Sequence, residues 1–455
     1  MNNNYEVIVH KWNSILNKVS AFGGKVRPLI IEPPATEREI LEKERSLGVS
    51  FPPHFKDVLI RFSKHVEFNW YLPSSINLPK EFREIFSGEI RWDLNSLENL
   101  NNLAEELESR YEGEETGLRN KIQFMMAGNG DILAVDMAKS NGPIIYWDHE
   151  TAEIYSLADN FIEYINYITD LYGVGSEIWQ YEMFLDEHAL NPNSTAAVKW
   201  RHWFDTFTML SKDKDRNNNL DKLIKFILYS GEIKQTELKA LKKFDTNIVF
   251  NKVQECIKEV DESHREILYR IIGEAVGEHA SDWVRSLWNN PMDINLKYRS
   301  YLTAKCLPTA EGLERVIYYV ESQFTNSVKD HIAKEHLCHF RNYRVIDWMK
   351  GYISKGTTKD NWYSLFACSE PTWKQVKEWL ENGGKFRMVA MNALEYMIRS
   401  WNSNPSYIQE NYKISNPPFK DEVLLVLEKV KSEEILNSKK KVYDMIIDHI
   451  DYLLI

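Results

Sequence analysis

The chain of 455 residues contains little cysteine, glycine or proline, with 4, 19 and 15 residues. Of these, only cysteine can form disulfides or hold a zinc ion. Cys256, Cys306, Cys338 and Cys368 all lie in the C-terminal half, and none belongs to a Cys-x-x-Cys pair. This spacing suits neither a zinc site nor a compact disulfide framework, so we interpret the cysteines as small core residues.

Long apolar runs are absent as well. No segment approaches the roughly 20 apolar residues that a transmembrane helix needs, and the first residues show no signal-peptide pattern. We therefore expect a cytoplasmic protein that makes no contact with a membrane. Apolar residues make up 43% of the chain and aromatic residues 13%. This composition is sufficient for buried cores, and the length predicts two domains.

The common catalytic motifs are also missing. There is no Walker loop, no Gly-x-Ser-x-Gly, no His-Glu-x-x-His and no Gly-x-Gly-x-x-Gly. The segment from Gly128 to Asp131 lies between two predicted strands, which indicates a hairpin turn and not a phosphate loop. Asp131 and Asp136 are five residues apart on one strand and so point to opposite faces. We assign Asp131 to the turn and Asp136 to a strand end, and we expect no enzyme, no cofactor and no metal.

One helix offers an alternative to that expectation. His331, Glu335 and His339 are spaced at i, i+4 and i+8 on one predicted helical face. The outer two would lie about 12 Å apart by helical rise, too far to share one metal ion. A polar face is therefore the favoured interpretation. An enzyme with a site in the C-terminal half is the alternative, and a stoichiometric metal ion would support it.

Charge is distributed unevenly along the chain. Residues 1–180 contain 17 Lys+Arg and 28 Asp+Glu, whereas residues 181–455 contain 39 of each. The excess of 11 negative charges is therefore on the N-terminal part. Such a field repels nucleic acid and accelerates association with basic partners. We expect a protein partner, and no nucleic-acid binding by this part.

The N-terminal part predicts an α+β domain over residues 1–180. A capping box formed by Thr36 and Glu39 begins a helix that Gly48 ends, and a second amphipathic helix follows Pro53. The apolar runs at 122–126, 131–136, 144–147 and 153–156 predict four strands. Two Asn-Gly pairs separate the first three of these runs, which is typical of hairpins with type I′ turns. A helix from about Asp159 closes this antiparallel meander.

An ordered series of short motifs in this region resembles the SUKH superfamily, which is named in part for fungal regulators of cell-wall synthesis. The series covers roughly residues 30–170 and consists of Pro34-Ala35-Thr36, Ile40, Glu44, Leu47-Gly48, Pro52-Pro53, Phe55-Lys56, Phe124, Gly128-Asn129-Gly130-Asp131, Val135-Asp136, Ile144–Trp147 and Phe161-Ile162-Glu163-Tyr164. The resemblance implies binding without catalysis. Bacterial members are similar to immunity proteins that neutralise polymorphic toxins by direct contact.

The C-terminal part predicts helices alone. Residues 181–199 read as a linker, and residues 200–455 as a helical domain. Second helices expected near Ser281, Thr309, Tyr343 and Glu370 give steps of 27 to 34 residues, which is typical of an α-solenoid and similar to HEAT-like repeats. A single irregular helical bundle is the alternative.

The acidic segment around residues 105–115 is the predicted partner-binding surface. Tryptophan and tyrosine side chains beside it are expected to anchor the partner, as aromatic residues do in tight interfaces. The predicted residues are Trp92, Glu105, Glu106, Glu108, Tyr111, Glu112, Glu114, Glu115 and Trp147. Toxins that act on nucleic acid are commonly basic, so the expected function is immunity against a basic toxin domain. The alternative is a regulatory or defence scaffold that binds several proteins through the helical repeat.

Overall fold

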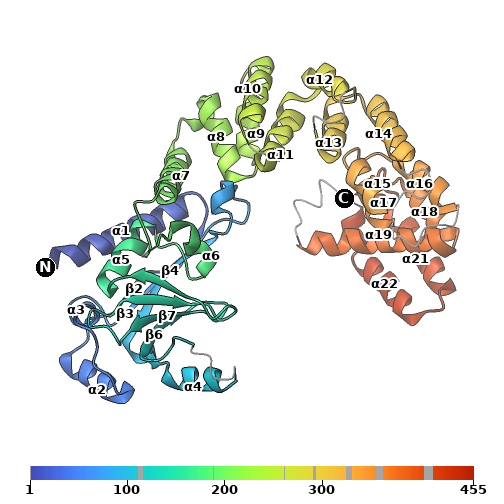
Figure 1. Cartoon of the computed structure of the whole chain (residues 1–455). Coiled ribbons are helices and arrows are strands. Elements are labelled where there is room, and N and C mark those ends of the chain that lie inside the picture. Colours follow the sequence, from blue (N-terminus) through green and yellow to red (C-terminus); the bar gives the residue numbers. More distant parts are fainter. Residues whose placement is uncertain are drawn as a thin grey trace. The chain divides into compact units, whose positions relative to one another are not determined.

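The computed structural model describes residues 2–110, 116–187, 189–260, 262–289, 294–323, 330–354, 362–403 and 413–454. The chain divides into two compact units, Met1–Glu237 and Leu238–Ile455. Each unit is described by itself below (Figure 1). The predicted order, an α+β part followed by an all-helical part, is confirmed.

The N-terminal unit begins with three helices, α1 (Asn2–Ala21), α2 (Glu37–Leu47) and α3 (Pro53–Arg61). The predicted capping box begins α2, because Thr36 accepts from the amide of Glu39 and the Glu39 carboxylate accepts from the amide of Thr36. Gly48 ends α2 with a φ of 69°, a left-handed conformation that glycine adopts at little cost.

Two short strands between α1 and α2 and two longer strands after α3 form a four-stranded sheet. It consists of β1 (Lys25–Val26), β2 (Ile30–Ile31), β3 (His65–Tyr71) and β4 (Ser87–Asp93). All seven residues of β3 pair with β4, and β1 and β2 share the opposite edge of β3. Val66, Phe68 and Trp70 are fully buried while their neighbours are not, the alternation that a strand with one buried face requires.

The predicted meander is the second sheet, with strand order β5-β6-β7-β8-β9. Its strands are β5 (Glu98–Asn99), β6 (Lys121–Met126), β7 (Ile132–Asp136), β8 (Ile144–Trp147) and β9 (Ile154–Ala158). Both Asn-Gly pairs lie in hairpin turns. Gly130 and Gly142 have positive φ, 101° and 62°, but the asparagines before them do not. The hairpins are confirmed, whereas the type I′ turns, which need positive φ at both residues, are wrong.

Helices cover both faces of the second sheet. Phe124, Val135 and Tyr146 point to the main core, which α5 (Phe161–Asp170) completes. On the other face Ile132 and Trp147 pack in a smaller cluster with α4 (Asn101–Arg110). Figure 1 shows α4 and α5 on opposite sides of the sheet. Strands buried on both faces explain why these runs are apolar at successive positions.

The predicted linker at residues 181–199 is part of the N-terminal unit. It runs from α6 (Ile178–Tyr181) into α7 (Thr195–Lys212), and α8 (Leu220–Ser230) follows. Phe184 and Leu190 are buried in the main core, and the indole N–H of Trp200 donates to the carbonyl of Leu171 at 3.0 Å. The boundary between the units lies at Glu237, later than predicted, because α7 contributes to the N-terminal core.

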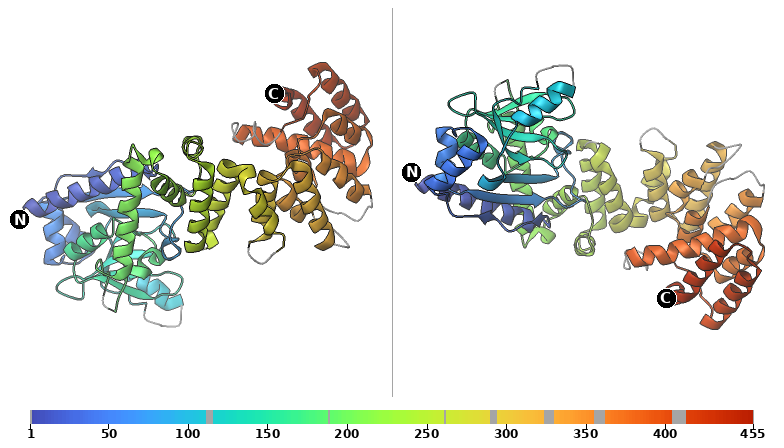
Figure 2. Two further views of the ribbon diagram at one scale, coloured as in Figure 1. Left: turned by 90° about the horizontal axis from the view of Figure 1, so that it is seen from above. Right: turned by 90° about the horizontal axis from the view of Figure 1, so that it is seen from below.

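The C-terminal unit consists of helices in the residues that the structure describes (Figure 2). After α9 (Gln235–Leu241), which spans the boundary, the helices are α10 (Thr246–Glu259), α11 (Glu262–Ile271), α12 (Ser281–Ser286), α13 (Leu296–Cys306), α14 (Thr309–Gln323), α15 (Asp330–Leu337), α16 (Arg344–Ser354), α17 (Tyr363–Cys368), α18 (Trp373–Glu381), α19 (Gly384–Ser403), α21 (Lys420–Glu433) and α22 (Asn437–Asp448).

The predicted second helices coincide with α12, α14, α16 and α18, which begin within a few residues of the expected positions. Each helix packs mainly on helices near it in the chain, for example α13 on α12 and α14. The helical character is therefore confirmed, and the assignment to HEAT-like repeats stays a prediction. Within the described ranges, no helix is both long enough and apolar enough to cross a bilayer.

Candidate partner-binding surface

Helix α4 carries the described half of the predicted acidic segment. Leu100 and Ala104 bury its inner side, so Glu105 and Glu106 are exposed. Two arginines offset this charge: Arg119 pairs with Glu108 at 2.5 Å and lies 3.6 Å from Glu105. The other, Arg110, pairs with Glu106 at 2.7 Å. Three acids facing two arginines leave a net charge of −1, so this helix is less acidic than its sequence indicates.

The rest of the predicted segment lies outside the described residues. This applies to Tyr111, Glu112, Glu114 and Glu115. The prediction for these four residues is unchanged.

The two predicted tryptophan anchors are core residues. Trp92 is fully buried, and its ring lies 5.4 Å from that of Phe161. Its indole N–H donates to the carbonyl of Ser63 at 3.0 Å. Trp147 lies under α4 and is 6% exposed. Burial leaves neither ring available to a partner, so this part of the site prediction is corrected. Alternation in β4 places Trp92 on its buried face, and all four residues of β8 are buried.

Replacing Trp92 by phenylalanine tests that assignment. The change removes the hydrogen bond to Ser63 and part of the ring, so we expect the free energy of unfolding to fall by about 1–2 kcal/mol. Urea denaturation measures this loss. The matched control is Trp179→Phe, at a residue that is 37% exposed, where a change below about 0.5 kcal/mol is expected. Weaker partner binding by folded Trp92→Phe protein would restore Trp92 as an anchor.

A buried carboxylate organises the two turns at one end of the second sheet. Asp131 is fully buried. Its Oδ1 accepts from the backbone N–H of His149 at 2.9 Å and from Nδ1 of the same residue at 2.6 Å. Its Oδ2 accepts from the side-chain amide of Asn129 at 2.5 Å and from the hydroxyl of Tyr146. Asp131 therefore lies in the turn, as predicted, and its hydrogen bonds join the turn that contains Asn129 to the turn that contains His149.

Protonation in this cluster follows from the same contacts. Burial opposes the charged form of Asp131, but the hydrogen bonds from Tyr146, His149 and Asn129 outweigh it and hold the pKa of the carboxyl below its usual value. The hydrogen bond to Asp131 raises the pKa of His149. The pair therefore favours a carboxylate bonded to a protonated imidazole.

This cluster has the composition of a metal site. One ligand atom each from Asp131, Asp148 and His149 lies within 4.8 Å of the others. A metal ion, however, needs free lone pairs on its ligands. Asp131 already accepts from four donors, two on each oxygen, which fills its acceptor positions. The arrangement therefore fits an internally satisfied turn better than a cation site.

Glu177 closes the same end of the sheet. Its carboxylate accepts from the backbone amides of Gly128 and Asn129, while burial and the nearby charge of Asp131 raise its pKa. Its Oε2 has no hydrogen-bond partner among the described residues. A raised pKa allows a proton to satisfy that oxygen, which relieves the repulsion from Asp131. Hydrogen bonds from the backbone and side chains therefore hold the carboxyl groups of Asp131 and Glu177 at this end of the sheet.

A stretch without basic residues was missed by the sequence analysis. Residues 140–198 contain no Lys or Arg, and they contain 10 acidic residues, Asp148, Glu150, Glu153, Asp159, Glu163, Asp170, Glu177, Glu182, Asp186 and Glu187. A count in shorter windows would have found it. This stretch forms β8, β9, α5 and α6. Asp148 and Glu177 of this stretch are buried and Asp170 pairs with Lys11, whereas Glu150 and Glu153 beside β9 are exposed and, unlike the acids of α4, have no arginine next to them in the sequence.

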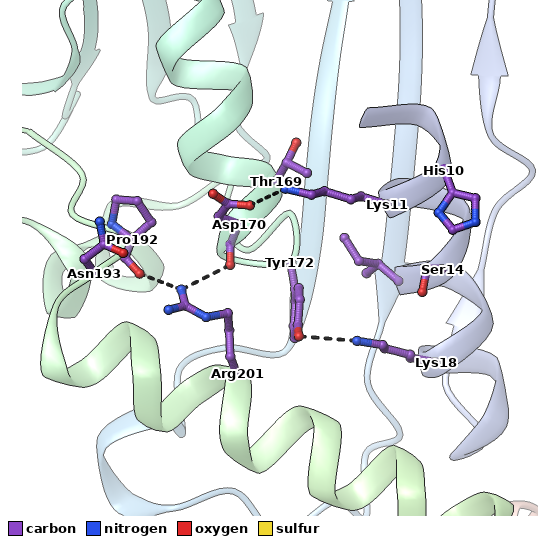
Figure 3. Close-up of a pocket in the computed structure, with 11 residues that line it drawn as sticks. His10, Lys11, Ser14, Lys18, Thr169, Asp170, Tyr172, Pro192, Asn193 and Arg201 are labelled. Carbon is purple, nitrogen blue, oxygen red and sulfur yellow. Dashed lines mark hydrogen bonds and ion pairs between the residues drawn. The ribbon is translucent and has the colours of Figure 1, made fainter. Parts of the chain in front are cut away.

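A polar cavity of about 430 Å³ lies between α1, the end of α5 and α7 (Figure 3). Lys11 pairs with Asp170 at 2.8 Å, and Lys18 pairs with Asp205 at 2.6 Å. Arg201 donates to the carbonyl oxygens of Pro192 at 2.5 Å and Asp170 at 3.4 Å. Every cation of this cavity is engaged by the protein itself. The cavity thus fits a junction that holds α7 on the core better than an anion site.

The helix proposed as the alternative metal site is shorter than predicted. Helix α15 ends at Leu337, before His339, and the side chain of His331 lies outside the described residues. Burial lowers the pKa of His339 to about 4, and its ring packs edge-on against Tyr301. The buried ring of His336 lies 3.2 Å from the hydroxyl of Ser300. The three predicted ligands therefore do not share one helical face.

Comparison with known proteins agrees with the resemblance over one part of the chain. Residues 34–167 match the model of the SMI1/KNR4 family (SUKH-1). This match contains the Asp131 cluster and β9. No curated protein and no solved structure matches the chain.

Proposed function

We propose that this chain, whose residues 34–167 form a SUKH-1 domain, is a non-enzymatic immunity protein that binds a basic toxin domain and neutralises it by contact. The observation that carries the proposal is the stretch of residues 140–198, which has no Lys or Arg and whose exposed acidic residues are Glu150, Glu153, Asp159, Glu182, Asp186 and Glu187. A surface of one charge sign accelerates association with a partner of opposite charge and disfavours other partners. The filled acceptor positions of Asp131 support a binding role over catalysis.

A second candidate function is a scaffold that binds proteins through the helical unit. Exposed apolar side chains near α21 favour it, because Phe419, Ile435 and Leu425 are 90%, 89% and 72% exposed. Exposed apolar side chains mark binding sites where they form a contiguous patch, whereas single ones are common on protein surfaces.

The two functions are separated by affinity capture from the native host with the full chain, followed by purification of each captured protein. For immunity we expect one dominant basic protein that inhibits growth when expressed alone and is harmless when this chain is co-expressed. Its dissociation constant should rise at least tenfold between about 50 and 500 mM salt, because exposed charges are screened.

The matched variants are Glu150→Lys/Glu153→Lys on the acidic surface and Phe419→Ala/Ile435→Ala on the helical unit. Immunity requires that the first variant loses protection and the second keeps it. Several weak partners that are lost only with the second variant would replace immunity with the scaffold function.

A further inference from the structure

Strand β9 forms the free edge of the second sheet. It is last in the strand order and pairs only with β8 among the described strands. Its far end is covered, because the amide of Leu190 donates to the carbonyl of Leu157 at 3.1 Å. Among the described residues, no backbone group bonds the outward side of the segment Ile154 to Ser156. Both end residues are exposed, and the side chain of Ile154 lies beside Gly117.

The register of the sheet shows which backbone groups face outward. The carbonyl of Glu153 accepts from the amide of Asp148 and so points toward β8. Tyr155, directly opposite Tyr146, points the same way. Since backbone groups alternate along a strand, the N–H and C=O groups of Ile154 and Ser156 point away from β8. No residue in the described ranges bonds these four groups.

This edge lacks the usual protection against strand addition. Natural edges are commonly blocked by lysine, proline or a covering segment. Residues 153–158 contain neither lysine nor proline, and Leu190 covers only the far end. An open edge with two exposed residues at alternate positions is the geometry to which an extended peptide adds a strand.

Negative charge surrounds the open segment. Glu150 and Glu153 lie in the turn before β9 and are exposed. The hydrogen bond to Glu153, burial, and the nearby charges of Asp148 and Glu182 raise the pKa of Tyr155 to about 12, which places these carboxylates around the middle of the strand. A strand with basic side chains would meet opposite charge along this edge, and an acidic strand would be repelled.

We infer that the free edge of β9 receives an extended, basic strand of the partner protein, which pairs with Ile154 and Ser156 and extends the sheet. This inference rests on the proposed function and names the surface that it uses. A second copy of this chain is a poor occupant, because its own β9 would bring the same acidic residues against these. The partner is therefore a different, basic protein.

The test uses the full chain and three synthetic octapeptides. One alternates lysine and valine, a second alternates glutamate and valine, and the third is the lysine–valine peptide with N-methyl groups on alternate amides. Binding is followed by fluorescence anisotropy, and hydrogen exchange locates the protected amides. We expect the lysine–valine peptide to bind and to protect the amides of Ile154 and Ser156. The other two peptides should bind at least tenfold more weakly.

Two variants of the chain separate the edge from the charge. Ser156→Pro removes an outward N–H that no described group uses, so folding should persist, as proline is tolerated at free edges. This variant should weaken binding of the lysine–valine peptide at least tenfold. Glu150→Lys/Glu153→Lys should do the same, whereas the matched control Glu105→Lys/Glu106→Lys on α4 should change affinity less than twofold. Thermal unfolding checks that each variant is folded.

Failure of this inference differs from failure of the proposed function. Protection elsewhere than β9, an unchanged affinity in folded Ser156→Pro, or equal loss in the α4 control would overturn the strand-addition inference. None of these outcomes involves the toxin. Immunity itself is overturned only by the capture and protection experiments with the native partner.

Discussion

Replacing Asp131 by alanine is expected to lower the free energy of unfolding of the N-terminal unit by about 4 kcal/mol. The carboxylate accepts from four donors, and the buried hydroxyl of Tyr146 is among them. Alanine leaves the buried hydroxyl of Tyr146 without this acceptor, and a buried orphan costs about 1–3 kcal/mol, while the partly exposed Asn129 and the exposed His149 lose a charged hydrogen-bond partner. Urea denaturation, followed by the near-ultraviolet signal of the aromatic core, measures the loss.

The control for this prediction is Glu150→Ala, in the neighbouring turn. Glu150 is exposed, so a change within about 0.5 kcal/mol is expected. If Asp131→Ala cost no more than this control, the four hydrogen bonds would not stabilise the fold, and the cluster would need another explanation.

The same cluster gives stability a pH dependence. The pKa of Asp131 is lowered on folding, so its contribution is present above the ordinary pKa of an aspartate and is lost as pH falls through the folded value. The pKa of His149 is raised, so its contribution is present below the ordinary histidine pKa and is lost as pH rises through the folded value. Both contributions coincide between about pH 4 and 6.5. The stability difference between wild type and Asp131→Ala should be largest there.

Local signals were sufficient for most of the α+β domain. Thr36, Glu39 and Gly48 determine the two ends of α2 through hydrogen bonds within a few residues, so a short window contains the information. The strands β6 to β9 were found in the same way, because the Gly130 and Gly142 turns separate runs of apolar residues. The turn type was not found, since Asn-Gly also fits turns in which only the glycine has positive φ.

Two elements were missed although their patterns are present. Ile8, Trp12, Ile15 and Val19 lie on one face of α1 and are buried, which is helical spacing. In β3, Val66, Phe68 and Trp70 alternate with polar residues. Helix α1 was not predicted. Strand β3 was not predicted either, because a Pro- and Ser-rich loop follows it directly.

The site was predicted less well than the fold because charge in sequence does not determine charge in space. Glu108 is offset by Arg119, a residue eleven positions away that the fold brings within 2.5 Å. The stretch 140–198 has no basic residue of its own, yet Lys11 pairs with Asp170, and both Asp148 and Glu177 are buried. Its exposed charge next to β9 is therefore that of residues such as Glu150 and Glu153. Trp92 illustrates the same limit for aromatic residues. Its burial depends on Trp12 and Phe161, which are distant in sequence.

The end of the N-terminal unit leads to the second large prediction, because the core continues past residue 180. The ring of Phe207 stacks on that of Phe22 with centroids 4.8 Å apart, and Phe204 lies 6.0 Å from Trp70. Trp200 is fully buried as well. A fragment of residues 1–180 lacks these three aromatic residues of α7, and Trp203 as well. Loss of each large buried side chain costs about 3–5 kcal/mol. The sum is similar to the whole stability of a domain, about 5–15 kcal/mol.

We therefore expect the fragment 1–180 to show no cooperative thermal transition and a weak near-ultraviolet signal, whereas a fragment of residues 1–237 unfolds in one cooperative step. Circular dichroism distinguishes the two, and Phe204→Ala in the longer fragment should lower its midpoint without removing the transition. Equal midpoints for both fragments would mean that α7 is not part of this core. If the prediction is correct, loss of partner binding by residues 1–180 would report loss of the fold and not the position of the interface, so binding to the SUKH-1 domain has to be measured on residues 1–237 or on the full chain.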